Sequence, residues 1–150
     1  TERGNHNAAT ILWNKIAPTT NETLLSTRLA GISASGNHAE ALSFAEEILK
    51  AIPNHQNALF VKARHYYEYA EKRYQEEMTK YNRDPNFTAY AYLRRELRQI
   101  SADYRTARDL FIQLHEISPE NKNYMRYLKN TYLRLEMRAE AARIDQMLGE

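Results

Sequence analysis

The stretch GNHAEALSFAEEILKAIPN, residues 36–54, contains the pattern that decides the fold. It opens with Gly-Asn, which is typical of the end of one helix and the start of the next. It stops at Pro53, because proline cannot continue a helix. Ala41 and Ala45 are four residues apart and share one helix face. Amphipathic helices usually bury their largest apolar residues, so this small-residue face predicts that a second helix approaches closely.

The four prolines lie at a regular interval, at positions 18, 53, 85 and 119. A fixed period of about 20–50 residues is typical of repeat proteins. Between the prolines, apolar residues recur at spacings of three and four, as one helix face requires. This predicts helices over residues 22–35, 38–52, 87–101, 103–117, 121–135 and 138–148. We expect turns at residues 36–37, 101–103 and 136–137, and we find no strand pattern.

These features resemble the tetratricopeptide repeat, a helix–turn–helix unit of about 34 residues with the pattern W-x2-L-G-x2-Y, A-x3-F, P. The best match is A-x3-F at residues 107–111 followed by Pro119, and the alanine pair at residues 41–45 lies at the same distance from Pro53. The resemblance implies an all-α superhelix of antiparallel helix pairs, in one domain spanning residues 1–150. The implied repeats are residues 22–53, 55–85, 87–119 and 121–148.

Two segments depart from the family pattern. Apolar residues keep helical phase from Leu59 to Tyr81 without a turn signal, so we expect one long helix around residues 55–82; the alternative is a pair with a weakly marked turn. Residues 1–18 carry Trp13 where a small residue is expected and are predicted to form an N-terminal helix or cap. Because the chain begins with Thr1 and lacks a polar capping helix at its end, we expect it to be part of a longer protein.

No arrangement of residues indicates catalysis, a cofactor or a metal site. The chain has no cysteine, and its five histidines lack metal-ligand spacing, so we expect them on the surface or in turns. Asn21 and Asn86 begin glycosylation sequons after proline turns, where we expect helix N-caps instead. No apolar run reaches the roughly 18 residues of a membrane span. We therefore expect a soluble, non-enzymatic protein, with the cytoplasm slightly favoured over the periplasm or export.

The resemblance also implies a function, since in that family the first helices line a concave groove that holds an extended peptide or a partner helix. The chain is therefore expected to be a protein-interaction scaffold. Tyr67 and Tyr92 are the leading recognition residues, because aromatic side chains with a polar tip are favoured in interfaces; a core role is the alternative. The implied groove is lined by Asn57, Phe60, Arg64 and Tyr67, by Tyr92, Glu96 and Gln99, and by Asn123, Arg126, Asn130 and Arg134.

The partner is expected to be a protein or peptide. Residues 122–143 carry six basic and two acidic side chains, which favours an acidic partner. Arg126-x3-Asn130 resembles part of the clamp by which some family members hold a C-terminal carboxylate, although the first repeat offers only Ser26 and Ala30 at the equivalent positions. Two alternatives are a structural homo-oligomer and a nucleic-acid-binding helical domain. The net charge of +2 argues against the latter.

Overall fold

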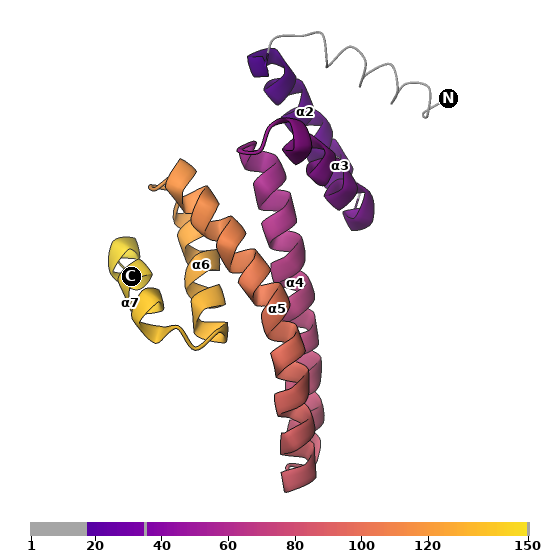
Figure 1. The fold of residues 1–150 in the computed structure, drawn as a ribbon, viewed down its shortest axis with the longest axis vertical. Coiled ribbons are helices and arrows are strands. Elements are labelled where there is room, and N and C mark those ends of the chain that lie inside the picture. Colours follow the sequence, from indigo (N-terminus) through magenta and orange to yellow (C-terminus); the bar gives the residue numbers. More distant parts are fainter. Residues whose placement is uncertain (1–17, 35, 150) are drawn as a thin grey trace. The chain divides into compact units, whose positions relative to one another are not determined.

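The computed structural model describes residues 18–34 and 36–149, which form helices joined by short turns (Figure 1). No strand occurs in these two ranges, so the all-α prediction is confirmed. None of the described helices is both long enough and apolar enough to cross a membrane. The helices are α2 (Pro18–Ala34), α3 (His38–Ala51), α4 (Gln56–Arg83), α5 (Phe87–Ile117), α6 (Lys122–Arg134) and α7 (Arg138–Leu148).

The chain divides into two compact units between Ala58 and Leu59, in the first turn of α4. In the first unit, α2 packs on α3. Ala41 and Ala45 are buried there, which confirms the predicted small-residue face. Asn37 caps α3, because its side-chain oxygen accepts a 3.1 Å hydrogen bond from the backbone N–H of Glu40.

His55 lies in the turn before α4 and is buried. Its Nδ1 accepts a hydrogen bond of 3.1 Å from the backbone N–H of Ala58, so the imidazole caps the helix. Its Nε2 lies 3.2 Å from the Ser26 hydroxyl. Because Nδ1 is the acceptor, Nε2 carries the proton of the neutral ring and donates to Ser26. This histidine therefore stabilises the fold of the first unit.

The second unit contains two helices much longer than a typical repeat helix. α4 runs unbroken for 28 residues, so the prediction of one long helix is confirmed. α5 runs for 31 residues through positions 101–103, so the predicted turn there is wrong. The turn-favouring side chains are satisfied within the helix: the Ser101 hydroxyl donates to the Leu97 carbonyl at 2.8 Å, and Asp103 pairs with Arg73 of α4 at 3.8 Å.

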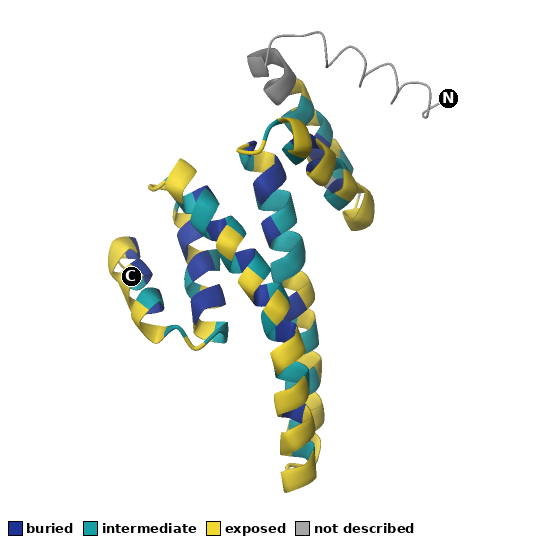
Figure 2. Cartoon of the chain, in the orientation of Figure 1, coloured by how far each residue is buried: buried dark blue, intermediate teal, exposed yellow. Residues whose placement is uncertain are grey.

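α4 and α5 form a long hairpin around residues 84–86. Asn86 caps α5 by accepting a hydrogen bond of 2.8 Å from the Ala89 N–H, as predicted, whereas Asn21 stands inside α2 and not at the position before its first residue. We call residues 74–83 and 87–99, the end of the hairpin, the distal arm, and its tip runs on beyond α6 and α7 (Figure 1). Most of the arm is exposed (Figure 2).

The core of the second unit is concentrated where α5 meets the first half of α4 and α6 (Figure 2). Six tyrosines lie at the helical spacing of the apolar residues, and of these Tyr104 and Tyr132 are buried and Tyr90 is exposed. The remaining three are half-buried, at positions 66, 74 and 81.

The turn between α6 and α7 falls where it was predicted. Glu136 has φ 60°, in the left-handed region that favours glycine. The Met137 N–H bonds to the Tyr132 carbonyl at 2.8 Å and the Glu136 N–H to the Leu133 carbonyl at 3.1 Å. These are the two bonds of a Schellman motif, which ends α6. The predicted cap at residues 1–18, with Trp13, lies outside the described residues except for Pro18, which begins α2.

Candidate functional site

Two of the predicted groove segments meet on a surface of the second unit formed by α4 and α6. The ring of Tyr67 contacts that of Tyr127, with centroids 5.2 Å apart and nearly perpendicular planes. The Asn130 side chain forms a hydrogen bond with the Tyr67 side chain. Burial and the nearby Glu71 carboxylate raise the pKa of Tyr67, so its hydroxyl remains a neutral donor at physiological pH. We call this surface the α4–α6 face and define it by Phe60, Arg64, Tyr67, Tyr127, Asn130 and Arg134.

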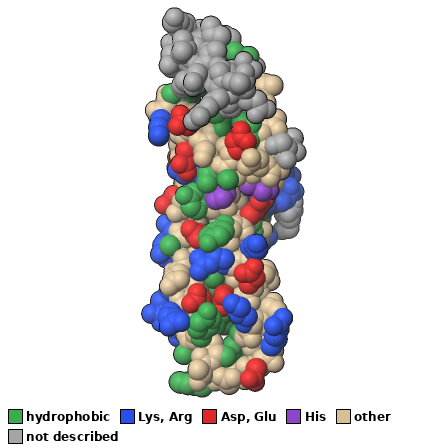
Figure 3. Space-filling view, turned by 90° about the vertical axis from the view of Figure 1, so that its right-hand side faces the viewer, with side chains coloured by type: hydrophobic (Ala, Val, Ile, Leu, Met, Phe, Trp, Pro, Cys, Tyr) green, Lys and Arg blue, Asp and Glu red, His purple; other side chains and the backbone are tan. Residues whose placement is uncertain are grey.

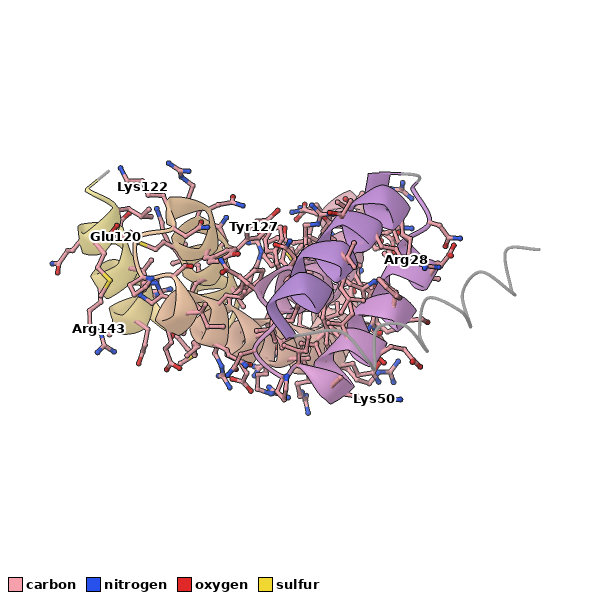
Figure 4. All side chains as sticks on the ribbon, turned by 90° about the horizontal axis from the view of Figure 1, so that it is seen from above. Arg28, Lys50, Glu120, Lys122, Tyr127 and Arg143 are labelled. Carbon is pink, nitrogen blue, oxygen red and sulfur yellow. The ribbon has the colours of Figure 1, made fainter. Side chains whose placement is uncertain are left out.

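The floor of the α4–α6 face is a cluster of aromatic rings. Phe111 of α5 is buried and stacks on Tyr127 with centroids 5.0 Å apart and planes 8° from parallel. Phe60 contacts Tyr124 and Tyr127 at 5.5 and 5.7 Å between centroids. Tyr127 packs on the buried Phe111, whereas Lys122 points outward (Figure 4). The rings hold one another in place and present a preformed, half-buried surface.

Arg64 adds a positive charge beside these rings. Its guanidinium lies 5.5 Å from the centroid of Phe60, which is a cation–π contact. It also pairs with Glu68 at 3.6 Å, but both side chains are well exposed, so this pair contributes little to stability. The guanidinium therefore keeps donors available to a carboxylate at this edge of the face.

A polar network fixes the other end of the face. Glu71 accepts two hydrogen bonds from Arg134, at 2.7 and 3.3 Å, and one of 2.6 Å from the Tyr104 hydroxyl. The Arg134 guanidinium stacks on Tyr74, 4.0 Å from the ring centroid. Burial acts to raise the pKa of Glu71, but the bonds from Arg134 and Tyr104 outweigh it and hold the pKa below its ordinary value. Burial, then the adjacent carboxylate, raises the pKa of Tyr104 well above its usual range.

We expect Glu71→Gln to lower the free energy of unfolding near pH 7 by about 1–3 kcal/mol, because charge-assisted bonds are lost around a half-buried group. The folded-state pKa of Glu71 is depressed below 4.5. Its contribution is therefore fully present above pH 4.5 and is lost as pH falls through the folded-state pKa. Urea unfolding of both proteins across this range measures the difference. A gap that stays constant down to the lowest pH would contradict the role of the charge, and the exposed Glu76→Gln is the control.

The structure places the other predicted residues in several positions. Asn123 and Arg126 are exposed on α6. They precede Tyr127 and Asn130 of the α4–α6 face by one helical turn each. Asn57 is exposed in the first turn of α4 and belongs to the other compact unit. The residues predicted from the third repeat lie on the distal arm and not on the α4–α6 face; they are Tyr92, Glu96 and Gln99.

On the arm, two of these three residues have identified contacts. The Arg95 guanidinium lies 5.1 Å from the ring centroid of Tyr92, which remains 43% exposed. Glu96 pairs with Arg73 of α4 at 3.8 Å, which ties the two helices together where the arm begins. The structure thus brings together the predicted residues of α4 and α6, and separates those of α5 from them.

Sequence reasoning missed two residues that organise the α4–α6 face. Tyr127 joins the rings of Phe60, Tyr67 and Phe111, but α6 has three tyrosines and nothing in its spacing marks this one. Glu71 resembles any charged residue on an exposed helix face. The one usable signal is that a buried Tyr104 requires a partner for its hydroxyl.

A second feature of this unit is a hollow of about 420 Å³ beside the arm. It lies where α5, Tyr74 of α4 and the end of α6 converge. Its lining includes Arg94, Arg98 and Arg105 from one stripe of α5, together with Arg134. We call this the arginine hollow, and its apolar lining consists of Leu97, Ile100, Leu133 and Leu135.

Comparisons with protein-family models, with curated proteins and with solved structures each find no match for this chain.

Proposed function

We propose that the chain is a non-enzymatic protein-interaction scaffold of tetratricopeptide-like helix pairs that binds a peptide or partner segment on the α4–α6 face. The observation that carries the proposal is the contact of Tyr67 with Tyr127 and Asn130. Tyr67 lies on α4 and the other two residues lie on α6, yet the three side chains form one surface of aromatic rings and an amide. Tyrosine and arginine are the residue types most enriched where binding energy is concentrated.

The helix order supports a modified repeat count. We propose that the first half of α4 pairs with the second half of α5 as a single repeat, and that the distal arm is an insertion between them. Phe60 and Tyr67 contact Phe111, which belongs to the A-x3-F match. The repeats implied at residues 55–85 and 87–119 then become one unit, Pro85 marks the arm's turn, and three helix pairs replace four.

The acidic partner expected from the sequence is consistent with the charges at this face. Arg64 and Arg126 both lie on the helices that form it, and Asn130 offers an amide beside Tyr67. Asn130 is already bonded to the Tyr67 hydroxyl, so a carboxylate would have to share the amide N–H donors with that hydroxyl. A bidentate contact from an arginine is the stronger source of recognition.

A variant at Arg126, which lies on α6 one turn before Asn130 of the α4–α6 face, tests whether a partner binds there. We expect Arg126→Ala to lose a partner retained by the wild-type protein in quantitative pull-downs from cells that express it. The matched control is Arg143→Ala, because that exposed arginine points outward from α7 (Figure 4). Both variants should keep the wild-type helical signal and melting temperature. Equal retention by the two variants would remove Arg126 from the site, and equal loss would indicate nonspecific charge attraction.

Homo-oligomerisation is a second candidate, favoured by the aromatic side chains exposed near the arm's turn. Phe87 is 88% exposed, and Tyr90 and Tyr92 are also exposed. Exposed aromatics of this size are typical of interaction surfaces. Light scattering over a concentration series decides between the two, because a mass constant at 17.6 kDa excludes self-assembly.

Nucleic-acid binding has less support. On the face drawn in Figure 3, basic side chains alternate with acidic and hydrophobic ones instead of forming a continuous patch. A tract that follows a phosphate backbone requires such continuity.

A further inference from the structure

The arginine hollow combines unneutralised positive charge with exposed apolar surface. Arg94, Arg98 and Arg105 are all exposed, and their spacing of four and seven places them on one face of α5. Arg94 contacts the Tyr90 ring at 6.0 Å. Within residues 36–149, no ion pair involves any of these three guanidinium groups. A row of unpaired arginines beside one hollow is an electrostatic complement for carboxylates.

The acidic groups nearby do not neutralise this row. Glu71 is bound to Arg134 and Tyr104 on the inner side of the network. Glu136 lines the hollow and is the carboxylate that faces it, held at φ 60° by the turn after α6. Because Arg134 is paired with Glu71, the charges that remain in the lining of the hollow are three arginines and one carboxylate, that of Glu136.

The floor of the hollow is apolar and open to solvent. Leu133 at the end of α6 is 48% exposed, and Leu97 and Leu135 pack partly buried against the core formed by Ile100 and Tyr104. The volume of about 420 Å³ falls within the range of roughly 300–1,000 Å³ typical of ligand pockets. A floor of leucines ringed by arginines fits an apolar side chain with negative charges on either side.

We infer that the arginine hollow binds an acidic segment of a partner protein, inserting a large apolar side chain between carboxylates that pair with Arg98 and Arg105. Peptide fits this site better than nucleic acid. The guanidinium of Arg134 already covers one face of Tyr74, which removes a stacking platform for a base. Tyr104 also lines the hollow, but its side chain is buried and its hydroxyl is bonded to Glu71, so its ring offers no open face for stacking.

The arginine hollow and the α4–α6 face share one residue, Arg134. The inference does not depend on the α4–α6 face binding anything, and the variants below leave the residues that define that face unchanged. Failure here and failure of the proposed function are therefore distinguishable.

The probe is a short fluorescein-labelled peptide in which central leucines are flanked by aspartates. Fluorescence anisotropy measures its dissociation constant with the full chain. We expect Arg98→Gln with Arg105→Gln to weaken binding at least about tenfold, because both charge-assisted contacts to the aspartates are removed. The matched control is Lys72→Gln with Arg138→Gln, which removes the same charge from exposed residues outside the hollow. Equal weakening by the two double variants would overturn the site.

Two single variants separate the apolar contact from the charge. We expect Leu133→Ser to weaken the leucine peptide about fivefold and to leave a matched peptide with serine in place of leucine unchanged. We expect Glu136→Gln to strengthen binding about threefold, because it removes a like charge from the hollow. Circular dichroism checks that all variants stay folded, and their exposed positions favour this.

Substituted peptides and an oligonucleotide test the alternative ligands. Peptides with asparagine for aspartate, or serine for leucine, should bind at least about tenfold more weakly than the probe. Failure of the probe to bind, or equal binding by the serine peptide, would overturn the inference. Labelled oligodeoxythymidylate is the nucleic-acid probe. If it binds more tightly than the peptide and shows the same dependence on Arg98 and Arg105, the hollow binds nucleic acid instead.

Discussion

Replacing Phe111 with alanine should lower the free energy of unfolding by about 3–5 kcal/mol. The side chain is fully buried, at 0% exposure. Its ring stacks on Tyr127 and meets Phe60 and Tyr67 edge-on at 6.5 and 6.3 Å between centroids. The substitution therefore removes the ring that three neighbours from two helices share, and leaves a cavity between them.

Phe87→Ala is the matched control, because the same side chain is deleted where it is 88% exposed. Its effect should stay within about 0.5 kcal/mol. Equilibrium urea unfolding followed by circular dichroism compares both variants with the wild-type protein. A loss below about 1 kcal/mol for Phe111→Ala would mean that the ring cluster is loosely packed. The α4–α6 face would then not be preformed, and its proposed role in binding would lose its structural basis.

Phe111 also shows how far the sequence leads. Its place in the A-x3-F match predicted that Ala107 and Phe111 share one face of a helix, and both are buried. Buried alanines at positions 41 and 45 were likewise predicted, since small residues at helical spacing indicate close packing. The local sequence predicts which residues share a buried face, because this depends only on the helical period and the sizes of the side chains within that helix.

Contacts between residues that are distant in the sequence were harder to predict from the sequence. The length of α4 was predicted but that of α5 was not, because Ser101 and Asp103 are compatible with either a turn or a helix. Contacts from another helix decide between them: Arg73 of α4 holds both Glu96 and Asp103. The same holds for Glu71, whose three hydrogen bonds come from residues 33 and 63 positions away.

The continuity of α5 leads to the second large expected effect. Ala102→Pro should destabilise the protein by about 3 kcal/mol or more, because proline in a helix interior loses a backbone hydrogen bond and its ring clashes with the preceding turn. Ala102 is exposed, so the substitution removes no core packing. A kink at this point would also disturb the packing of Ile100 and Tyr104 against Ala70, which joins the arm to the core.

Phe87→Pro distinguishes this mechanism from a general intolerance of proline. Position 87 is the first residue of α5, where the N–H has no helical partner, and Asn86 before it is extended, with φ −153° and ψ 174°. The exposed ring of Phe87 is not needed for packing, so we expect a change within about 0.5 kcal/mol. Urea unfolding of both variants gives the comparison. If α5 instead turned at residues 101–103, Ala102→Pro would be tolerated as well as Phe87→Pro, and the α5 side of the distal arm would be a separate short helix.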